Sequence, residues 1–175
     1  MDVQSAGQPG MRSATASDAR QLSALVRRAK AHWGYPKEWL AAWRAELTVT
    51  ADYIRLHRVV VMQQAGKIAG FYGLELRADV AHLEHLWVEP AYIGRGMGRM
   101  LLDQACSEAR ELGYASIELV ADPHAEPFYL HQGAVRIGEI RSAVLGCPRL
   151  LPKMRLGTKG YRSMRTTRAP SRVER

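Results

Sequence analysis

Cysteines and long apolar runs are both scarce in this chain of 175 residues. Its two cysteines, Cys106 and Cys147, are too few for a disulfide framework or a cysteine-based metal cluster. No uninterrupted apolar run approaches the length of a membrane span, and the N-terminus has no signal-peptide hydrophobic region. We therefore expect a cytoplasmic protein that does not contact a membrane. With 47% hydrophobic residues, the chain suits one domain with a sizeable core.

Negative charge is also scarce, but the resulting net charge of +8 is unevenly distributed. Residues 158–175 contain six cationic residues and one glutamate, a balance of +5, so the rest of the chain carries only +3. This segment has no apolar periodicity, and we expect it to be a basic disordered tail. Residues 1–10 are small and polar and predict a flexible leader before a domain over residues 11–157. The charge therefore gives little support to specific nucleic-acid binding.

Hydrophobic periodicity and turn residues predict a mixed α/β fold with flanking helices. Helices are expected from Ala19 to Gly34, from Pro36 to Leu47, from the glycine-rich segment to Gly113, and over 125–132. Strands are expected near residues 11–14, 58–64, 68–76, 82–88, 115–121, 134–140 and 150–156.

Glycine occurs at every second position in the segment Gly94, Gly96 and Gly98. A strand-like segment, 83–88, precedes these glycines, and a helix follows them at once. Glycine lets the backbone approach a bound group closely and adopt angles that other residues avoid. The consecutive N–H groups at a helix start, with the helix dipole, favour a phosphate or pyrophosphate.

Two common phosphate-binding motifs are absent from this segment. A Walker loop ends in Gly-Lys-Ser/Thr, whereas Arg99 and Met100 follow the last glycine here. A dinucleotide fingerprint needs a third glycine, which would fall at Arg99 or at Leu101, depending on the register. Both motifs are excluded.

The segment instead resembles the coenzyme A pyrophosphate loop of the GNAT superfamily of N-acetyltransferases, Arg/Gln-x-x-Gly-x-Gly/Ala. Gly96 and Gly98 occupy its two glycine positions, and Ile93 departs from the pattern at the first position. Residues 125–134 resemble a second motif of the family, A-x-x-F/L-Y-x-x-x-G-F/A. Residues 30–35, Lys-Ala-His-Trp-Gly-Tyr, resemble a segment of small uncharacterised members. The resemblance covers residues 11–157, with its motifs between 82 and 133.

This resemblance implies the GNAT fold, a mixed and mostly antiparallel sheet flanked by helices. It also implies transfer of an acetyl group from acetyl-CoA, as co-substrate, to a primary amine of a small molecule or a protein. The alternative is a non-catalytic module that binds acetyl-CoA for regulation. A homodimer is left open.

Coenzyme contacts are implied at the strand before the loop, at the loop and on the last short helix. In the family, the strand before the loop parts from its neighbour, and its free backbone groups pair with the pantetheine arm. A backbone N–H, that of Val88, would also hold the acetyl carbonyl. The implied contacts are Leu86, Trp87, Val88, Gly94, Arg95, Gly96, Met97, Gly98, Arg99, His124 and Tyr129.

Acetyl transfer also needs a base for the ammonium group and an acid for the departing thiolate. Strand alternation predicts His82, Glu84, Leu86 and Val88 on one face, so Glu84 would lie among apolar neighbours with a raised pKa. Glu84 is the predicted base, and His82 and His85 remain alternatives. The resemblance makes Tyr129 the predicted acid, because the family's tyrosine places its hydroxyl near the coenzyme sulfur.

The acceptor side has two interpretations. Aromatic and basic residues of the first two predicted helices line an amine pocket, or they form the core between the helices. Asp122 stands in the region where the family often has an asparagine. The histidines show no metal-ligand spacing, so we expect no bound metal. The acceptor-side residues are Lys30, His32, Trp33, Tyr35 and Trp39.

Overall fold

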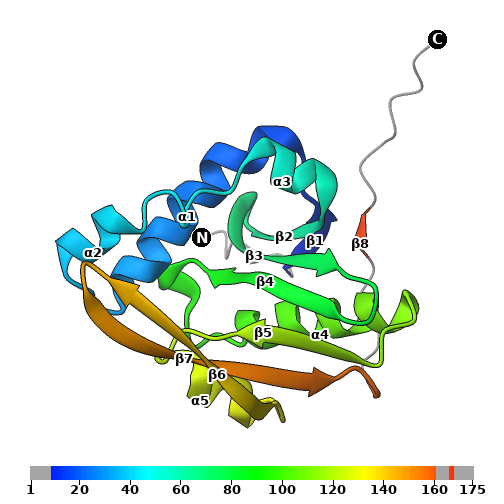
Figure 1. Cartoon of the computed structure of the whole chain (residues 1–175). Coiled ribbons are helices and arrows are strands. Elements are labelled where there is room, and N and C mark those ends of the chain that lie inside the picture. The colour runs from blue at the N-terminus through cyan, green and yellow to red at the C-terminus, as the bar shows by residue number, and fades with distance from the viewer. Residues whose placement is uncertain (1–8, 161–165, 168–175) are drawn as a thin grey trace.

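The strands form one sheet with the order β6-β7-β5-β4-β3-β2-β1-β8 in this computed structural model, which describes residues 9–160 and 166–167 (Figure 1). Neighbouring strands are antiparallel, except that β4 with β5 and β1 with β8 are parallel. The strands are β1 (Gly10–Ser13), β2 (Arg58–Gln64), β3 (Lys67–Leu76), β4 (Ala81–Val88), β5 (Ser116–Val120), β6 (Val135–Val144), β7 (Cys147–Gly157) and β8 (Thr166–Thr167).

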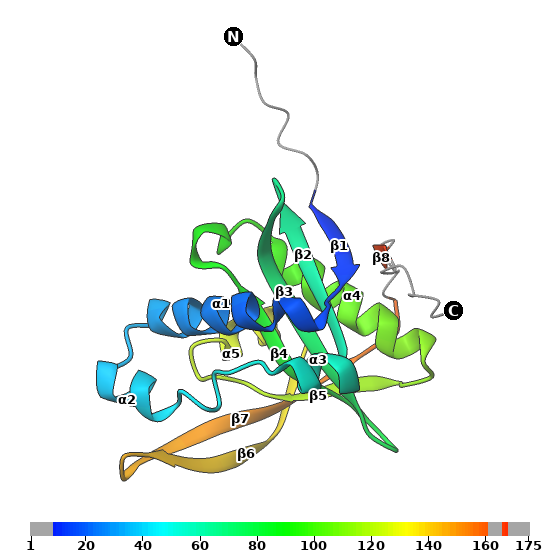
Figure 2. The same cartoon turned by 90° about the horizontal axis from the view of Figure 1, so that it is seen from above.

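Helices cover both faces of this sheet, and α1 crosses in front of the strands in Figure 2. Residues of α1 and α3 share one buried cluster with the sheet, whereas residues of α4 and α5 share the other. Short 3-10 turns precede α1 and α4. The helices are α1 (Ala19–His32), α2 (Lys37–Ala42), α3 (Ala51–Leu56), α4 (Met97–Glu111) and α5 (Glu126–His131), and the 3-10 turns are Ala16–Asp18 and Pro90–Tyr92.

Strand β2 shows how the two cores are divided. Val59 and Val61 belong to the cluster under α1, and Val60 and Met62 belong to the cluster under α4. Successive side chains of a strand point to opposite faces, so a strand buried on both faces is apolar at every position. The run of four apolar residues in β2 is therefore the consequence of a sheet with helices on both sides.

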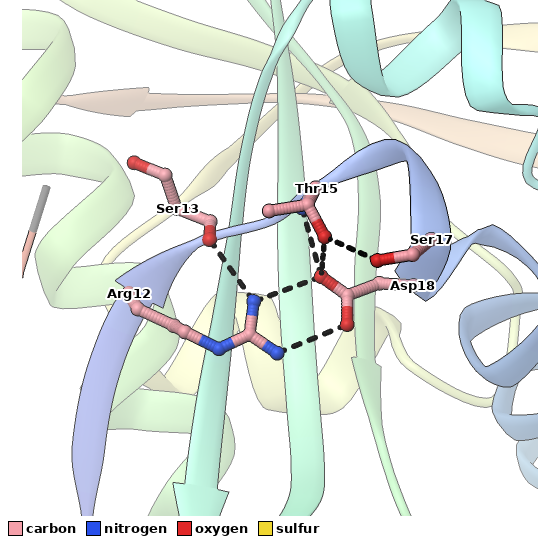
Figure 3. A network of polar contacts seen from close by, with 5 residues as sticks. All are labelled: Arg12, Ser13, Thr15, Ser17 and Asp18. Carbon is pink, nitrogen blue, oxygen red and sulfur yellow. Dashed lines mark hydrogen bonds and ion pairs between the residues drawn. The ribbon is translucent and has the colours of Figure 1, made fainter. Parts of the chain in front are cut away.

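An ion-pair network around Asp18 fixes the start of α1 (Figure 3). Arg12 on β1 donates two hydrogen bonds, of 2.8 and 2.9 Å, to the Asp18 carboxylate. The Thr15 N–H donates to the same carboxylate at 2.8 Å. Burial by itself would raise the pKa of Asp18, but the bonds from Arg12 and Thr15 lower it overall. This network sets the direction in which α1 leaves β1.

The predicted elements follow one another in the predicted order, but the prediction lacks α3 and β8, and two regions differ in extent. The helix predicted from Pro36 to Leu47 ends at Ala42, although Trp43 and Leu47 are still buried in the turns that follow. Helix α3 is absent from the sequence prediction, because six residues are too few for a helical period to be recognised. The hairpin of β6 and β7 is longer than predicted.

The predicted leader and tail are partly ordered. Gly10 belongs to β1, and Thr158 is buried, with its hydroxyl donating to the Tyr114 carbonyl at 2.7 Å. Thr166–Thr167 pairs with β1 in parallel. Most of the other residues of the leader and the tail lie outside the described residues, so their expected flexibility stays a prediction. Within residues 9–160 and 166–167, no helix combines the length and apolarity needed to cross a membrane.

Gly70 on β3 is required by close packing, and we expect its replacement by alanine to destabilise the fold. A Cβ at this position would lie 2.7 Å from the Trp87 carbonyl oxygen and 2.8 Å from Leu101 Cδ1. Because the carbonyl belongs to the neighbouring strand, G70A should lower the free energy of unfolding by about 1–3 kcal/mol in a urea titration. Gly138→Ala on β6 is the matched control, since nothing lies within 4 Å of its Cβ position. Equal losses in the two variants would contradict this interpretation.

Candidate active site

The parallel pairing of β4 with β5 ends after two residue pairs, Ala81 with Ile117 and His82 with Glu118. Beyond His82, β4 continues to Val88 with no further pairing to β5 among the described residues. The two strands therefore part, and a cavity of about 560 Å³ extends from the parted strands to the glycine loop and α5.

The main chain of β4 offers unpaired groups to this cavity. The Glu89 N–H donates to the Ala69 carbonyl of β3 at 2.8 Å. In an antiparallel ladder, hydrogen-bonded residues alternate with residues whose N–H and C=O groups point away from the partner. Trp87 therefore bonds to β3, whereas the backbone groups of Leu86 and Val88 point to the open side.

A β-bulge at Glu84 reverses the alternation of β4. Leu74 pairs with Leu83 and Gly73 pairs with His85, so Glu84 has no counterpart on β3. One extra residue in a strand shifts all side chains beyond it to the opposite face. The regular alternation on which the choice of base rests is therefore broken at the candidate base itself.

The predicted faces of β4 are wrong as a result. Leu83, Leu86 and Val88 all pack in the α4 cluster, although regular alternation separates Leu83 from the other two. His85 contacts the ring of Phe71, and Trp87 packs in the α1 cluster on the other side of the sheet. Glu84 is thus not on the apolar face of Leu86 and Val88.

The pKa of Glu84 is lowered, not raised as the sequence suggests. The main cause is the hydrogen bond with His82, whose Nε2 lies 3.3 Å from the carboxylate; burial acts in the opposite direction, and His85 adds to the lowering. The Glu84 side chain is 45% exposed. A carboxyl group is kept neutral by burial in apolar surroundings, and Glu84 has no such burial. Glu84 is therefore ionised at neutral pH.

His82 and His85, the two alternative bases, do not line the cavity, whereas Glu84 does. His85 is buried, and burial lowers its pKa, so its ring is neutral at pH 7. The Trp87 Nε1–H donates to His85 Nδ1 at 3.2 Å and so occupies the basic nitrogen. Glu84 is the one candidate base that reaches the cavity.

The glycine loop leads directly into α4. Gly94 and Gly96 have φ angles of +79° and +78°, a conformation that favours glycine. The first N–H to bond within the helix is that of Met100, which donates to the Gly96 carbonyl at 3.1 Å. The N–H groups of Met97, Gly98 and Arg99 precede it and have no partner within the helix. They lie at the positive end of the helix dipole, where an anion is favoured.

The residues of the loop divide between those that line the cavity and those that pack against the protein. Gly94, Gly96, Gly98 and Arg99 line the cavity, and Ile93 lies at the same wall. The two remaining predicted residues do not: the Met97 side chain is buried in the α4 core, and the Arg95 guanidinium lies over the Tyr92 ring at 5.6 Å. The other predicted coenzyme contacts on this wall are Leu86, Trp87, Val88, His124 and Tyr129.

Tyr129 on α5 faces the cavity although its side chain is nearly inaccessible, with 7% of its surface exposed. Burial raises the pKa of its hydroxyl well above the usual value. A phenol that keeps its proton is a hydrogen-bond donor at neutral pH. Phe128 lies beside it on the same wall, in edge contact with its ring.

Asp122, on the wall of the cavity, is the centre of a polar cluster. Its carboxylate forms an ion pair with Lys30 and accepts the Tyr35 hydroxyl at 2.8 Å and the His124 N–H at 3.0 Å. Arg149 of β7 donates to the Tyr35 oxygen at 2.9 Å. Burial alone would raise the pKa of Asp122, but the bond and charge of Lys30 and the other donors lower it overall.

The cluster decides between the two interpretations of the acceptor side. Lys30 is buried, and its Nζ lies 4.5 Å from the ring of Trp43, which Arg149 also covers at 4.7 Å. Burial lowers the pKa of Lys30, and Asp122 partly opposes this. Tyr35 and Trp39 pack in the same core, so of the predicted residues only Trp33 reaches the cavity wall. There it stacks on His124, with ring centroids 5.4 Å apart.

Sequence reasoning missed Arg149 because no local pattern connects it with a tyrosine 114 positions earlier. No group of three or more His, Cys, Asp or Glu side chains that could hold a metal occurs in the part of the chain that the structure describes.

We expect Asp122→Asn to lower the free energy of unfolding by about 3 kcal/mol at pH 7, because Lys30 then lies buried without its counter-charge. The folded-state pKa of Asp122 is lowered, so its contribution is present above the unfolded pKa of about 3.9 and is lost as the pH falls through the folded pKa. The difference between the two proteins should therefore shrink below about pH 4 in urea titrations.

Asp52→Asn is the control for this measurement, because Asp52 forms an exposed pair with Arg55, with side chains 81% and 60% exposed. Its effect should stay below about 1 kcal/mol. A loss in D122N no larger than in D52N would show that the cluster does not stabilise the fold.

Comparison with known proteins agrees with this geometry. The profile of the acetyltransferase (GNAT) family matches residues 21–134. No curated protein matches the chain significantly in sequence. Several solved structures share the fold at low identity, and three are described next.

A GCN5-related N-acetyltransferase from Rhodopseudomonas palustris is 21% identical with a TM-score of 0.72, over 89% of this chain and 99% of that chain. PaiA N-acetyltransferase from Thermoplasma acidophilum, solved with coenzyme A, is 18% identical with a TM-score of 0.69, over 86% and 99%. The ribosomal-protein-S18-alanine N-acetyltransferase from Escherichia coli is 20% identical with a TM-score of 0.66, over 95% and 99%. Because the family profile covers more than half of the chain, including the parted strands and the glycine loop, the protein belongs to the acetyltransferase (GNAT) family.

Proposed function

We propose that the protein is an N-acetyltransferase that transfers the acetyl group of acetyl-CoA to a primary amine by direct attack. The observation that carries this proposal is the cavity that joins the open edge of β4 to the unpaired N–H groups at the start of α4. Its volume is in the range of small-molecule sites, and its wall includes Leu86, Val88 and Phe128. These residues suit a ligand with an apolar arm and an anionic end, as acetyl-CoA has.

The main chain would position the thioester. In this proposal the backbone groups of Leu86 and Val88 pair with the amides of the pantetheine arm. The Val88 N–H donates to the carbonyl oxygen, where negative charge develops during attack. The N–H groups of Gly98 and Arg99 hold the pyrophosphate.

Glu84 would act on the acceptor amine. An ammonium group with an ordinary pKa of about 10.4 must lose its proton before it can attack. The ionised Glu84 attracts the ammonium group and receives its proton through water. Because the Glu84 pKa is lowered, proton removal depends mainly on the amine and on pH. Glu84 is therefore a weaker base than a buried, neutralised carboxyl group would be.

Tyr129 would stabilise the departing thiolate. The pKa of the coenzyme thiol is about 8.5 by analogy with cysteine. Since burial raises the pKa of Tyr129, complete transfer of its proton to the thiolate is unfavourable. Tyr129 therefore acts as a hydrogen-bond donor to the sulfur, and the proton that finally reaches the thiolate comes from the acceptor amine or from water.

The acceptor is either a small molecule or a protein amine. The name of one structural relative specifies an alanine of the ribosomal protein S18. The ionised Glu84 and the Trp33–His124 stack on the wall are compatible with a cationic acceptor. A homodimer and a cytoplasmic location stay predictions.

One alternative is a module that binds acetyl-CoA without catalysis. It is favoured by the lowered pKa and the exposure of Glu84, which weaken its action as a base. It retains every main-chain contact of the first proposal. The two candidates therefore differ in turnover and not in coenzyme binding.

We expect acetyl-CoA to bind in a calorimetric titration and thiol to be released when primary amines are added. A screen across small amines, polyamines and peptides with free N-termini identifies the acceptor class. Absence of binding to the well-folded protein contradicts both candidates. Binding without thiol release across all amine classes favours the regulatory module.

Tyr129→Phe should lower kcat by about tenfold to a hundredfold while changing the Kd for acetyl-CoA by less than about threefold. The substitution removes one hydroxyl and keeps the ring, so the cavity wall is preserved. Steady-state thiol release gives kcat, and calorimetry gives Kd. Unchanged turnover in Y129F would remove Tyr129 from the mechanism.

A further inference from the structure

A second, polar cavity of about 390 Å³ lies beside the proposed coenzyme site. Three segments form it: the first turns of α4, the end of α5, and the chain after β7. Its wall consists of Arg99, Asp103, His131, Gln132, Lys159 and Gly160.

The two cavities share part of their wall. Arg99, His131 and Gln132 line both of them. Arg99 is the third residue of α4, so the second cavity begins where the glycine loop ends. A ligand whose pyrophosphate lies at the loop therefore has its next chemical group at this second cavity.

The second cavity has an excess of positive charge. Arg99 and Lys159 contribute two cations, against the single carboxylate of Asp103. The Arg99–Asp103 contact is long, at 3.7 Å, and its Arg99 side chain is 69% exposed, so it holds Arg99 weakly. No carboxylate of residues 9–160 or 166–167 forms an ion pair with Lys159. Both cations are therefore available to an anionic ligand.

Coenzyme A carries an anionic group at the required position. Its ribose bears the pyrophosphate on the 5′ oxygen and a separate phosphate monoester on the 3′ oxygen. Because one ring carries both groups, the 3′-phosphate stays near the pyrophosphate. A phosphate monoester is close to doubly charged at pH 7 and is a strong hydrogen-bond acceptor.

We propose that this second cavity binds the 3′-phosphate of the coenzyme through Lys159 and Arg99, and so selects acetyl-CoA over its dephospho form. The proposal rests on the proposed function, because it places the pyrophosphate at residues 93–99. Asp103 opposes the phosphate charge and limits the affinity. His131 and Gln132 complete the polar wall.

Lys159 is the residue to test, because Arg99 lines both cavities and its loss would affect the pyrophosphate as well. The Kd values of acetyl-CoA and dephospho-acetyl-CoA are measured by calorimetry for the wild type and for K159A. We expect K159A to raise the Kd of acetyl-CoA about five- to tenfold and to change the Kd of the dephospho form by less than about twofold. Asp103→Asn should lower the Kd of acetyl-CoA and leave the Kd of the dephospho form unchanged.

Lys67→Ala is the matched control, since it removes the same charge from an exposed position at the start of β3. Its Kd values for both ligands should equal those of the wild type. If both ligands bind equally well, or if K159A weakens them equally, the phosphate site is refuted while the proposed function stands. If neither ligand binds, the proposed function fails and this inference fails with it.

Discussion

The main-chain pairing between β4 and β5 stops after two residue pairs, and the rest of the site depends on this break. Backbone N–H and C=O groups need partners, so an open edge inside a sheet is a binding surface for another chain-like group. At the end of β4 the loop of residues 93–99 adds the unpaired N–H groups of the first turn of α4. Both sets of donors belong to the main chain. The departure at Ile93 therefore removes one side-chain contact and leaves these donors in place.

The carboxylates around the cavity are held by neighbouring cations or donors. Asp122 binds Lys30 and Tyr35, which lie 92 and 87 positions earlier in the chain, and Arg149 joins them from β7. This cluster holds α1, the segment after β5 and the β6–β7 hairpin at one end of the cavity. On β4, His82 pairs with Glu84. These pairs keep both carboxylates ionised, so neither of them is a neutral acid at pH 7.

The local signals in the sequence were sufficient for the glycine loop, the start of α4 and the order of the elements. They failed on the faces of β4. A strand considered alone has a period of two, but the bulge at Glu84 arises from the pairing of β4 with β3. Next to the bulge, Gly73 of β3 lies so close to α3 that a Cβ there would be 2.7 Å from the Tyr53 hydroxyl. The same failure explains the pKa of Glu84: regular alternation predicts Leu86 and Val88 as its apolar neighbours, whereas the bulge separates the carboxylate from them and leaves it with His82.

The sequence by itself determined the features that arise from a few consecutive residues: the spacing of Gly94, Gly96 and Gly98, the motif around Tyr129, and the family that both indicate. Such features depend on backbone preferences that act over one or two turns of chain. Only the tertiary structure decided the cavity, the position of Glu84 on its wall, the Asp122 cluster and the polar pocket at Lys159. Each of these depends on contacts between distant segments, and burial and charge at such contacts are set by the packed fold.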